Sequence, residues 1–518
     1  MRKITTTVAA ALVALSFAAC NKTNNEATPE IAQGDTYASL TIAAGNKLRA
    51  AQDDNIGRDA EGAVKSISLF NINTTLEFTT LGTDFKQVGE YYKTSPFKTS
   101  AGNRAYALVL NRGSVTLPEF ISTAPDAVSA DSETAAKYAS EDEGFVMTSK
   151  VEAFDVKANI TKEMVDGLTA PDKTKNGFEL NTERVVAQGI VTTPLETSKP
   201  ISTTDKLGDL SELKYGGAMG AKQTYIFGNY AGERLMGSDH RYDNYKSYVD
   251  DVVTSIDYAD KTNRDKFQLA EKTDRALVRV DKSPNYTTPF AAAGYYFFEN
   301  SCANPSDQAN LGAHRNAYAK VYGVYTPKTI LTIKKTFKAQ AKTGKYFDPA
   351  TGEPKKEADG GKEGIVVETL TKVEGFKAGT TFYQGENDKV FYTSAAAAKM
   401  STTFPGQKSY MYKDGMCVYR IPWNQVKDGD KTIYADTRRN NIYVVNVTAF
   451  ERIGMNYDPN DVNDPNIPKP GDGDNPNEPT TPPDGGDPTW DEAETYAAFF
   501  TKVLPWNVVS RNVSLKKH

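Results

Sequence analysis

The sequence predicts an all-β protein built from two tandem antiparallel β-sandwich domains. Segments rich in Val, Ile, Tyr and Phe alternate with period two and are separated by turn residues, as half-buried strands are. Few helical segments lie between them, which argues against βαβ units. The strand-rich region, roughly 400 residues long, is too long for one sandwich, so two are expected. Strands are expected at residues 64–72, 105–110, 184–191, 317–325, 329–333, 416–423 and 442–450, with short helices at 132–139 and 394–400.

The composition argues against two other classes of protein. Mean hydropathy is -0.54, and the sequence holds only one long apolar run, which argues against a polytopic membrane protein. The net charge of -5 lacks the basic excess that a nucleic-acid footprint requires.

The first twenty residues are typical of an export signal. Basic Arg2 and Lys3 precede an apolar stretch over residues 8–19, which is too short to span a bilayer comfortably. The ending Ala18-Ala19-Cys20 resembles a bacterial lipobox. That resemblance implies cleavage before Cys20 and lipidation of its thiol, whereas the alternative is a plain signal followed by a chance cysteine. Cys302 and Cys417 are expected either to pair as a disulfide or to lie buried as thiols.

A short strand is expected at residues 37–44, after a polar tether over residues 21–35. Leu40 and Ile42 fall on one face of it, with Ser39 and Thr41 on the other. The next segment, residues 45–55, is polar and contains Gly and Asn, so a trypsin-like protease is expected to reach its basic residues.

The end of the chain combines a stiff spacer with a β-prone tail. Residues 458–488 hold nine of the 25 prolines and carry eight acidic residues against one lysine, a net charge of -7. Such a segment stays extended and spans up to about 95 Å at about 3.1 Å per residue. The aromatic tail, residues 490–518, is too short for a core of its own. It is expected either to add a strand to a neighbour's sheet or to fold back on its own chain.

Several short motifs resemble the fimbrillins of the Bacteroidales type. The motifs are Thr437-Arg438-Arg439-Asn440-Asn441-Ile442-Tyr443 with Val445 and Val447, then Ile453-Gly454 and Tyr457-Asp458-Pro459, and also Glu183-Arg184-Val185-Val186-Ala187. The spacer and the ending Val503-Leu504-Pro505-Trp506-Asn507-Val508 resemble the major shaft subunit of the short (minor) fimbriae. The lipobox and residues 37–49 fit the same pattern, whereas residues 220–430 show no such resemblance.

The resemblance implies two transthyretin-like β-sandwich domains and polymerisation by donor-strand exchange. The expected divisions are a signal over 1–20, a segment removed on maturation over 21–49, domains over 50–194 and 195–457, a linker over 458–489, and a donor-strand region over 490–518. An Arg- or Lys-specific protease is expected to cut between Arg49 and Ala50, with Arg58 and Lys47 as alternative sites. The displaced strand carries Tyr37, Leu40 and Ile42, and the donor strand carries Val503, Leu504, Trp506, Val508, Val513 and Leu515.

The resemblance also implies partners and a location. The partners are further copies of the chain, accessory tip and anchor subunits and the protease, with no nucleic acid. The precursor is expected to be lipidated at the outer membrane and the mature protein to lie outside the cell in a surface fimbria. The donor strand departs from simple alternation near Val508-Val509, and Ser510-Arg511-Asn512 is polar, so a bulge or an exposed edge is expected there.

The sequence gives no motif for catalysis, a metal or a cofactor. It contains no HExxH, GxSxG or Walker A pattern, and His240, His314 and His518 are scattered. Asp239 beside His240 favours a surface turn over a catalytic dyad, and residues 471–475 favour a solvated linker over a Ca²⁺ loop. The rival functions are a tip or accessory adhesin, a glycan-binding surface lipoprotein and, without a supporting motif, a secreted hydrolase.

Overall fold

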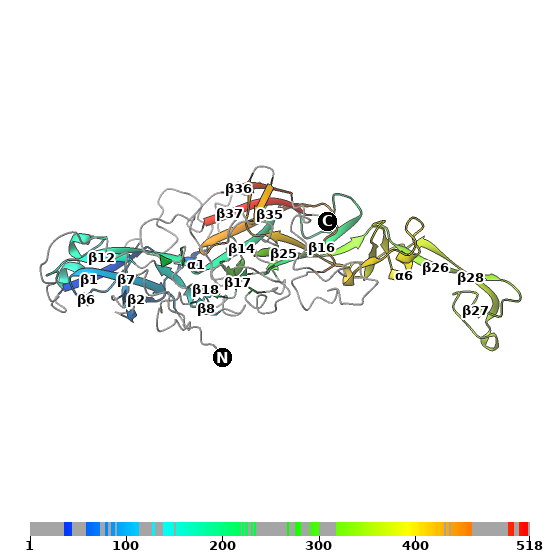
Figure 1. Cartoon of the computed structure of the whole chain (residues 1–518), viewed down its shortest axis with the longest axis horizontal. Helices are drawn as coiled ribbons and strands as arrows, with labels where there is room; N and C mark the ends of the chain where they lie inside the picture. Colours follow the sequence, from blue (N-terminus) through cyan, green and yellow to red (C-terminus); the bar gives the residue numbers. More distant parts are fainter. Residues whose placement is uncertain are drawn as a thin grey trace, which may run out of the picture.

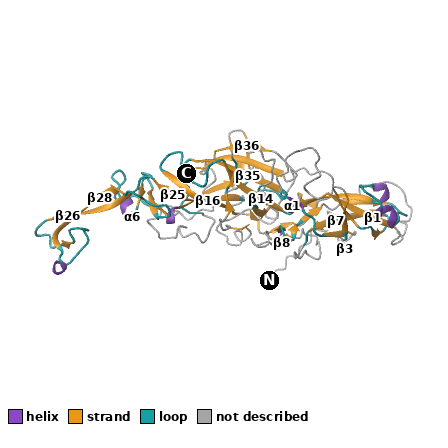
Figure 2. Cartoon of the chain, turned by 180° about the vertical axis from the view of Figure 1, so that it is seen from behind, coloured by secondary structure: helices purple, strands orange, loops and turns teal. Residues whose placement is uncertain are grey.

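The computed structural model is elongated, and groups of strands follow one another along its long axis (Figures 1 and 2). The structure describes residues 36–43, 58–72, 78–80, 84–88, 91–112, 127–129, 138–149, 152–218, 220–221, 223–225, 229–230, 233–234, 267–268, 275–280, 290, 292–299, 317–428, 431–434, 437–457, 496–501 and 507–515. Almost every regular element in these ranges is a strand, which confirms the predicted all-β fold.

The first group is a ten-stranded sheet with the order β3-β2-β7-β11-β13-β1-β5-β4, in which β12 pairs with β7 and β6 pairs with β1. Its strands are β1 (Thr36–Ala43), β2 (Ile67–Ile72), β3 (Phe78–Thr80), β4 (Phe85–Val88), β5 (Tyr91–Thr94), β6 (Phe97–Thr99), β7 (Gly102–Leu110), β11 (Met147–Ser149), β12 (Glu152–Val156) and β13 (Gly177–Arg184). The short helices are α1 (Asp59–Gly62), α3 (Lys162–Asp166) and a 3-10 turn, η2 (Lys173–Lys175). β9 (Ala139–Ser140) and β10 (Gly144–Phe145) form a small hairpin, and β8 (Ala127–Ser129) pairs with β18 (Gln223–Tyr225).

The second group is a sandwich of two sheets around a shared core. One sheet has the order β21-β17-β24-β14-β35-β37-β36 with β23 beside β14, and the other has the order β15-β16-β25-β32 with β22 beside β16. Apolar side chains from both sheets, including Val191, Phe297, Val321 and Ile421, form one buried cluster. The strands are β14 (Val186–Thr193), β15 (Ile201–Ser202), β16 (Gly208–Ala218), β17 (Gly220–Ala221), β21 (Phe267–Gln268), β22 (Arg275–Ala276), β23 (Val278–Arg279), β24 (Tyr295–Phe298), β25 (Tyr318–Pro327), β32 (Met416–Pro422), β35 (Asn441–Phe450), β36 (Tyr496–Thr501) and β37 (Asn507–Leu515). Two hairpins accompany them, β19 (Asn229–Tyr230) with β20 (Glu233–Arg234) and β33 (Gln425–Asp428) with β34 (Lys431–Tyr434).

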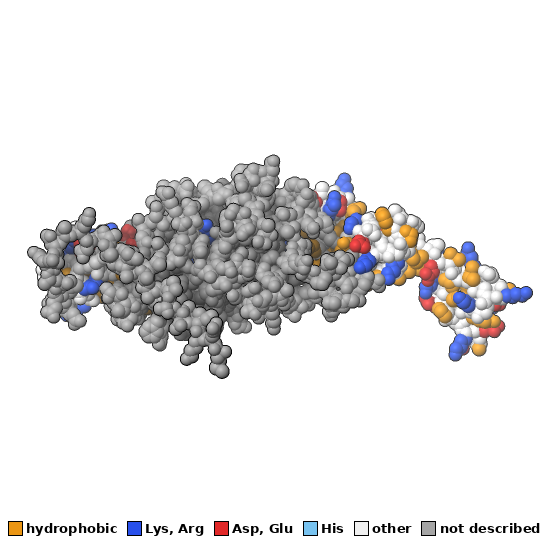
Figure 3. All heavy atoms as spheres, viewed as in Figure 1, with side chains coloured by type: hydrophobic (Ala, Val, Ile, Leu, Met, Phe, Trp, Pro, Cys, Tyr) orange, Lys and Arg blue, Asp and Glu red, His pale blue; other side chains and the backbone are white. Residues whose placement is uncertain are grey.

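The third group is a six-stranded sheet with the order β27-β28-β26-β30-β29-β31, which projects from the sandwich as an arm (Figure 1). It consists of β26 (Leu331–Ala339), β27 (Tyr346–Phe347), β28 (Lys362–Lys372), β29 (Phe382–Gly385), β30 (Phe391–Tyr392) and β31 (Ser409–Tyr412), with α6 (Ala395–Lys399), η6 (Glu357–Asp359) and η7 (Lys413–Gly415). Lysine, acidic and apolar side chains all reach its surface (Figure 3). The helix predicted at 394–400 is confirmed as α6, while residues 132–137 lie outside the described residues.

The strand predicted at residues 184–191 is wrong in one respect, because it is two strands. β13 belongs to the first sheet and β14 to the second, and Val185 lies between them. The sequence hides this change because Val185, Val186 and Ala187 are all apolar and fully buried. The chain therefore leaves the first sheet earlier than the predicted domain boundary at residue 194, and the domain division stays a prediction.

Candidate functional site

Strand β1 comes first among the described strands but lies in the interior of its sheet. On one side it runs parallel to β13, with Ser39 opposite Gly177. On the other side it runs antiparallel to β5, with Thr41 opposite Lys93, and to β6. Because both edges of β1 are paired, its removal would leave a gap between β13 and β5. The strand predicted at 37–44 is thus present, over residues 36–43.

The inner face of β1 fills the core of the first group. Ala38, Leu40 and Ile42 are fully buried and belong to the same apolar cluster as Leu108 of β7 and Leu180 of β13. Burying a Leu or Ile side chain contributes roughly 1.5–3 kcal/mol. Leu40 and Ile42 therefore supply the largest apolar side chains that β1 buries in this core.

The outer face of β1 is buried as well, although its side chains are polar. Ser39 is 0% exposed and Thr41 4% exposed. Residues 157–168, which include α3, cover this face, and we call them the clasp. The clasp bonds to the start of β1: the Tyr37 amide donates to the Ile160 carbonyl (2.9 Å), and Thr36 Oγ1 donates to the Lys157 carbonyl (2.7 Å).

Asn176 joins the clasp to β1 from the side. Its backbone is left-handed, with φ 54°, a conformation that asparagine tolerates better than most residues. Its Nδ2 donates to the carbonyls of Tyr37 (3.0 Å) and Lys157 (2.9 Å), and its own carbonyl accepts from the Ser39 amide (3.0 Å). On the opposite edge of the strand, the Leu40 amide donates to Thr94 Oγ1 (2.9 Å).

Lys93 of β5 ties the clasp to the sheet. Its residue is only 2% exposed, and its Nζ donates to the carbonyls of Val165 (2.6 Å), Asp166 (3.0 Å) and Leu168 (3.0 Å) at the end of α3. A cation at the C-terminal end of a helix satisfies carbonyls that have no partner within the helix. Burial lowers the pKa of Lys93, and nearby Lys86 acts in the same direction, while Asp166 opposes both.

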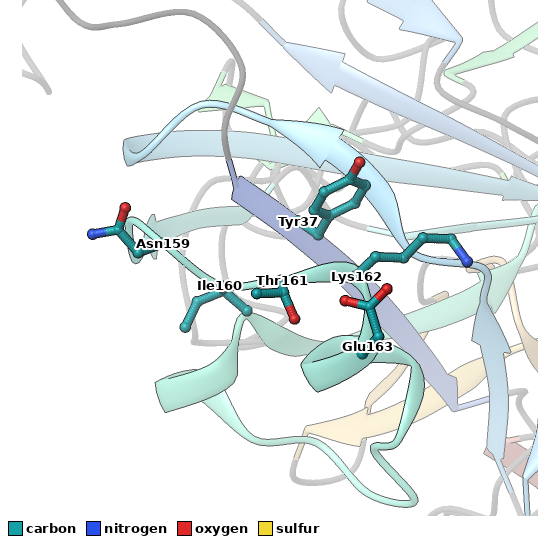
Figure 4. Close-up of a pocket in the computed structure, with 6 residues that line it drawn as sticks. All are labelled: Tyr37, Asn159, Ile160, Thr161, Lys162 and Glu163. Carbon is teal, nitrogen blue, oxygen red and sulfur yellow. The ribbon is translucent and has the colours of Figure 1, made fainter.

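A cavity of about 450 Å³ lies beside the start of β1 (Figure 4). It is lined by Tyr37, Asn159, Ile160, Thr161, Lys162 and Glu163. All of these residues except Tyr37 belong to the clasp. The cavity therefore lies between the clasp and the start of β1.

The C-terminal strand lies elsewhere, in the second group. β37 runs parallel to β35, with Val508 opposite Ile442 and Val513 opposite Val447. The register shifts between Val447 and Ala449, so the irregularity falls on β35 opposite the end of β37, and not near Val508-Val509 as the sequence predicted. On its other edge β37 pairs antiparallel with β36. In the single chain β36 and β37 therefore lie on their own second group, and the placement of the tail in a neighbour stays a prediction.

Arg58, one of the alternative cleavage residues, is held inside the folded body. It precedes α1, and its side chain is 18% exposed. Its guanidinium pairs with Glu61 (3.1 Å) and Glu141 (2.5 Å) and donates to Tyr296 Oη (2.9 Å). Burial alone would lower the pKa of Arg58, but Tyr296, Glu61 and Glu141 together raise it.

Several predicted site residues lie outside the described residues. They are Cys20, Lys47, Arg49, Ala50, Cys302, Val503, Leu504 and Trp506. Asp239, the three histidines and residues 471–475 also lie outside them. Of Val508, Val513 and Leu515 the structure gives the backbone in β37. Cys417 is fully buried in β32.

Within the described ranges, no group of three His, Cys, Asp or Glu side chains is placed to hold a metal ion. In the same ranges, no helix is long and apolar enough to cross a membrane.

Sequence reasoning missed the residues that hold β1, namely Thr36, Lys93, Thr94 and Asn176. The sequence gives no sign that Asn176 bonds to Tyr37, because the two residues lie far apart along the chain. It also missed the buried ion pair of Arg439 with Glu299, in which Nε and Nη2 each bind one carboxylate oxygen (2.9 and 2.5 Å).

No family model matches the chain, and no curated protein matches it. Among solved structures, it is similar to a fimbrilin from Porphyromonas gingivalis W83, with 15% identity over 93% of this chain and 98% of that chain and a TM-score of 0.37. It is similar to a putative cell adhesion protein from Parabacteroides distasonis ATCC 8503, with 12% identity over 81% and 94% and a TM-score of 0.36. It is also similar to the tip fimbrial protein Mfa3 from Porphyromonas gingivalis, with 12% identity over 65% and 99% and a TM-score of 0.29. At these values the likenesses carry no argument about function.

Proposed function

We propose that this chain is a structural subunit of a surface fimbria that polymerises by protease-assisted donor-strand exchange and so supports adhesion. An Arg- or Lys-specific protease cuts after β1, in the segment that holds Lys47 and Arg49. β1 then leaves, and the C-terminal strand of another copy fills the gap. The precursor is lipidated at Cys20 in the outer membrane, and accessory tip and anchor subunits end the polymer. The proposal gives the chain no catalytic role and no cofactor.

The observation that carries the proposal is the interior position of β1. A first strand that is paired on both edges leaves a gap bounded by β13 and β5 when it departs. The unpaired backbone of such a gap costs free energy until another strand bonds to it. The basic residues that follow β1 in the sequence offer the place to cut.

The position of the tail supports the proposal too. β36 and β37 end their sheet, so they can leave together while β35 keeps its pairing with β14. β37 already runs parallel to its neighbour β35, as β1 runs parallel to β13. The same relative orientation would let β37 bond to β13 of another copy.

The proposal is tested by deleting residues 503–518 and, separately, by changing Lys47 and Arg49 to Ala. The deletion should give a protein that is cut but stays monomeric, and the double change should give a folded, uncut monomer. Polymer is measured as a ladder on electrophoresis in mild detergent, and the mature start by N-terminal sequencing of surface polymer. A normal ladder from either variant would overturn the proposal.

A second candidate, a tip or accessory adhesin or glycan-binding surface lipoprotein, is favoured by the projecting arm. The hairpin of β26 and β28 pairs from Leu331 with Lys372 to Ala339 with Gly364 and reaches far beyond the sandwich (Figure 2). Such an arm presents a surface without adding to the core. Copy number separates the two candidates, since a shaft subunit is present many times in one fibre and a tip subunit once.

A further inference from the structure

Three kinds of contact hold the clasp over β1. Thr36, Tyr37 and Ser39 bond to it or to Asn176, as described above. Lys93 fixes the end of α3 to β5. Between them, Gly177 lets the clasp approach the sheet, because a β-carbon there would lie 2.5 Å from Leu168 Cδ1. Leu168 therefore packs over the sheet at the position next to Ser39, the partner of Gly177 across the parallel pair.

Ser39 is the residue of β1 whose buried side chain is least well satisfied. Its residue is completely buried, and its Oγ has no hydrogen-bond partner among the described residues. A buried polar group without a partner loses its bonds to water and gains none in return. Other side chains near β1 are satisfied: Thr36 Oγ1 donates to the Lys157 carbonyl and accepts from the Ile160 amide (3.2 Å).

We propose that the clasp, anchored by Lys93, controls the departure of β1, and that the orphaned hydroxyl of Ser39 makes β1 a removable occupant of its gap. The inference deepens the proposed strand exchange and rests on it for its biological meaning. The clasp must open, or β1 must slide from beneath it, before another strand can enter. A strand from a second copy that places a small apolar side chain beneath Leu168 fits the covered site better than Ser39 does.

The structure also shows which groups an incoming strand must bond to in order to replace β1. The Ile160 carbonyl, the Asn176 side chain and Thr94 Oγ1 all bond to the backbone of β1, and Asn176 Nδ2 also donates to Thr36 Oγ1 (3.2 Å). Any extended strand can make the backbone bonds, so these bonds do not choose between occupants. The side chains that face the core and the clasp therefore determine which strand binds better in the gap.

The test compares hydrogen exchange of residues 36–43 in the full, uncut chain and its variants, measured by mass spectrometry. Ser39→Ala should slow exchange of this segment about tenfold, because it removes the orphaned group. Lys93→Met should speed it by about tenfold or more, because the carbonyls of Val165, Asp166 and Leu168 lose their bonds from Lys93 Nζ. Lys98→Met is the matched control, since Lys98 is an exposed lysine on β6 opposite Tyr37, and it should change nothing.

A second control is another buried serine, for which the change to alanine should have the opposite effect on stability. Ser149 is also buried, but its Oγ accepts from the Leu108 amide (2.9 Å). Ser149→Ala should therefore lower the melting temperature, while Ser39→Ala should raise it. Equal effects of the two serine changes, or of the two lysine changes, would overturn the inference.

The same variants separate this inference from the proposed function. After cleavage by a trypsin-like protease, the lifetime of the N-terminal fragment on the folded body reports on the clasp, and the detergent-resistant ladder reports on polymerisation. Fast release of the N-terminal fragment from the Lys93→Met variant, with no ladder from any variant, would support control by the clasp and reject strand exchange. If a ladder forms and the fragment lifetime is the same in all variants, control by the clasp is rejected and strand exchange is kept.

Discussion

Arg184 donates from Nη1 to the side-chain oxygen of Asn440 across 3.0 Å, and this bond joins two segments that lie 256 residues apart in the sequence. Arg184 ends β13, and Asn440 precedes β35. The Asn440 amide also donates to the Val186 carbonyl (2.9 Å). Two of the short motifs that resemble a known family, residues 183–187 and 437–443, are thus parts of one junction, where the chain passes from the first group to the second.

The first prediction concerns Asn440, whose φ is 56°. Asn440→Ala should lower the free energy of unfolding by about 3 kcal/mol, because it removes an acceptor from a buried guanidinium and strains a left-handed position. Asn440→Gly should cost about 1 kcal/mol less, since glycine accepts that backbone. Urea unfolding measures both changes. Equal losses would mean that the backbone conformation of Asn440 contributes nothing.

The second prediction concerns the cleavage site. Because Arg58 is bound by Glu61 and Glu141, a trypsin-like protease should cut the native chain before residue 58 and leave Arg58 intact. Glu61→Gln removes the buried negative charge and should raise cleavage after Arg58 about tenfold. Mass spectrometry of the fragments after brief digestion identifies the site.

The control for this experiment is Glu141→Gln, which removes only the outer ion pair of Arg58. Its effect should be small, because Glu141 is 44% exposed and exposed pairs contribute little. Rapid cleavage after Arg58 in the unaltered chain would contradict the prediction and return Arg58 to the candidates for the natural site.

The sequence predicted the strand positions well where alternation was regular. Leu40 and Ile42 identified β1, because a buried strand face needs an apolar residue at every second position. The nearly continuous apolar run over 442–450 identified β35, which is buried on both faces. Alternation does not reveal which strands are neighbours. The position of β1 between β13 and β5 depends on contacts with residues far along the chain, so no local pattern predicts it.

Other features were hidden for specific physical reasons. Lys93 looks like a surface residue in the sequence, and only the end of α3 makes it a buried helix cap. The strand expected at residues 329–333 continues to Ala339 as β26, because exposed Lys334 and Lys338 weaken the apolar pattern of its second half. The tail shows no preference in sequence between its own β35 and a neighbour's β13.

The third prediction concerns the close packing of Gly189 in β14 against Trp423. A β-carbon at Gly189 would lie 2.6 Å from the indole ring, which is fully surrounded in the core of the sandwich. Gly189→Ala should therefore cost roughly 1–3 kcal/mol of stability. Gly167→Ala is the control, since its β-carbon would meet only the Glu163 carbonyl at 3.4 Å, and it should be nearly neutral. Thermal unfolding followed by tryptophan fluorescence distinguishes them.

The last prediction concerns the pH dependence of the arm. Asp388 Oδ2 accepts from Tyr392 Oη (2.6 Å), Ser401 Oγ (2.7 Å) and Gln407 Nε2 (2.7 Å), and Oδ1 accepts from the Val390 amide (3.0 Å). Burial alone would raise the pKa of Asp388, but these hydrogen bonds outweigh it and hold the pKa below its usual 3.8.

Since the folded pKa is lower than the unfolded one, the stability from Asp388 is present above about pH 3.8 and is lost as the pH falls through the folded pKa. Asp388→Asn should lower the melting temperature of the arm at pH 7 and remove its part of the acid transition. Calorimetry of the full chain between pH 7 and pH 2 measures this. Asp359→Asn, at an exposed residue of η6 in the same arm, should leave the curve unchanged, and an equal effect of both changes would show that general surface charge, not the Asp388 network, sets the acid response.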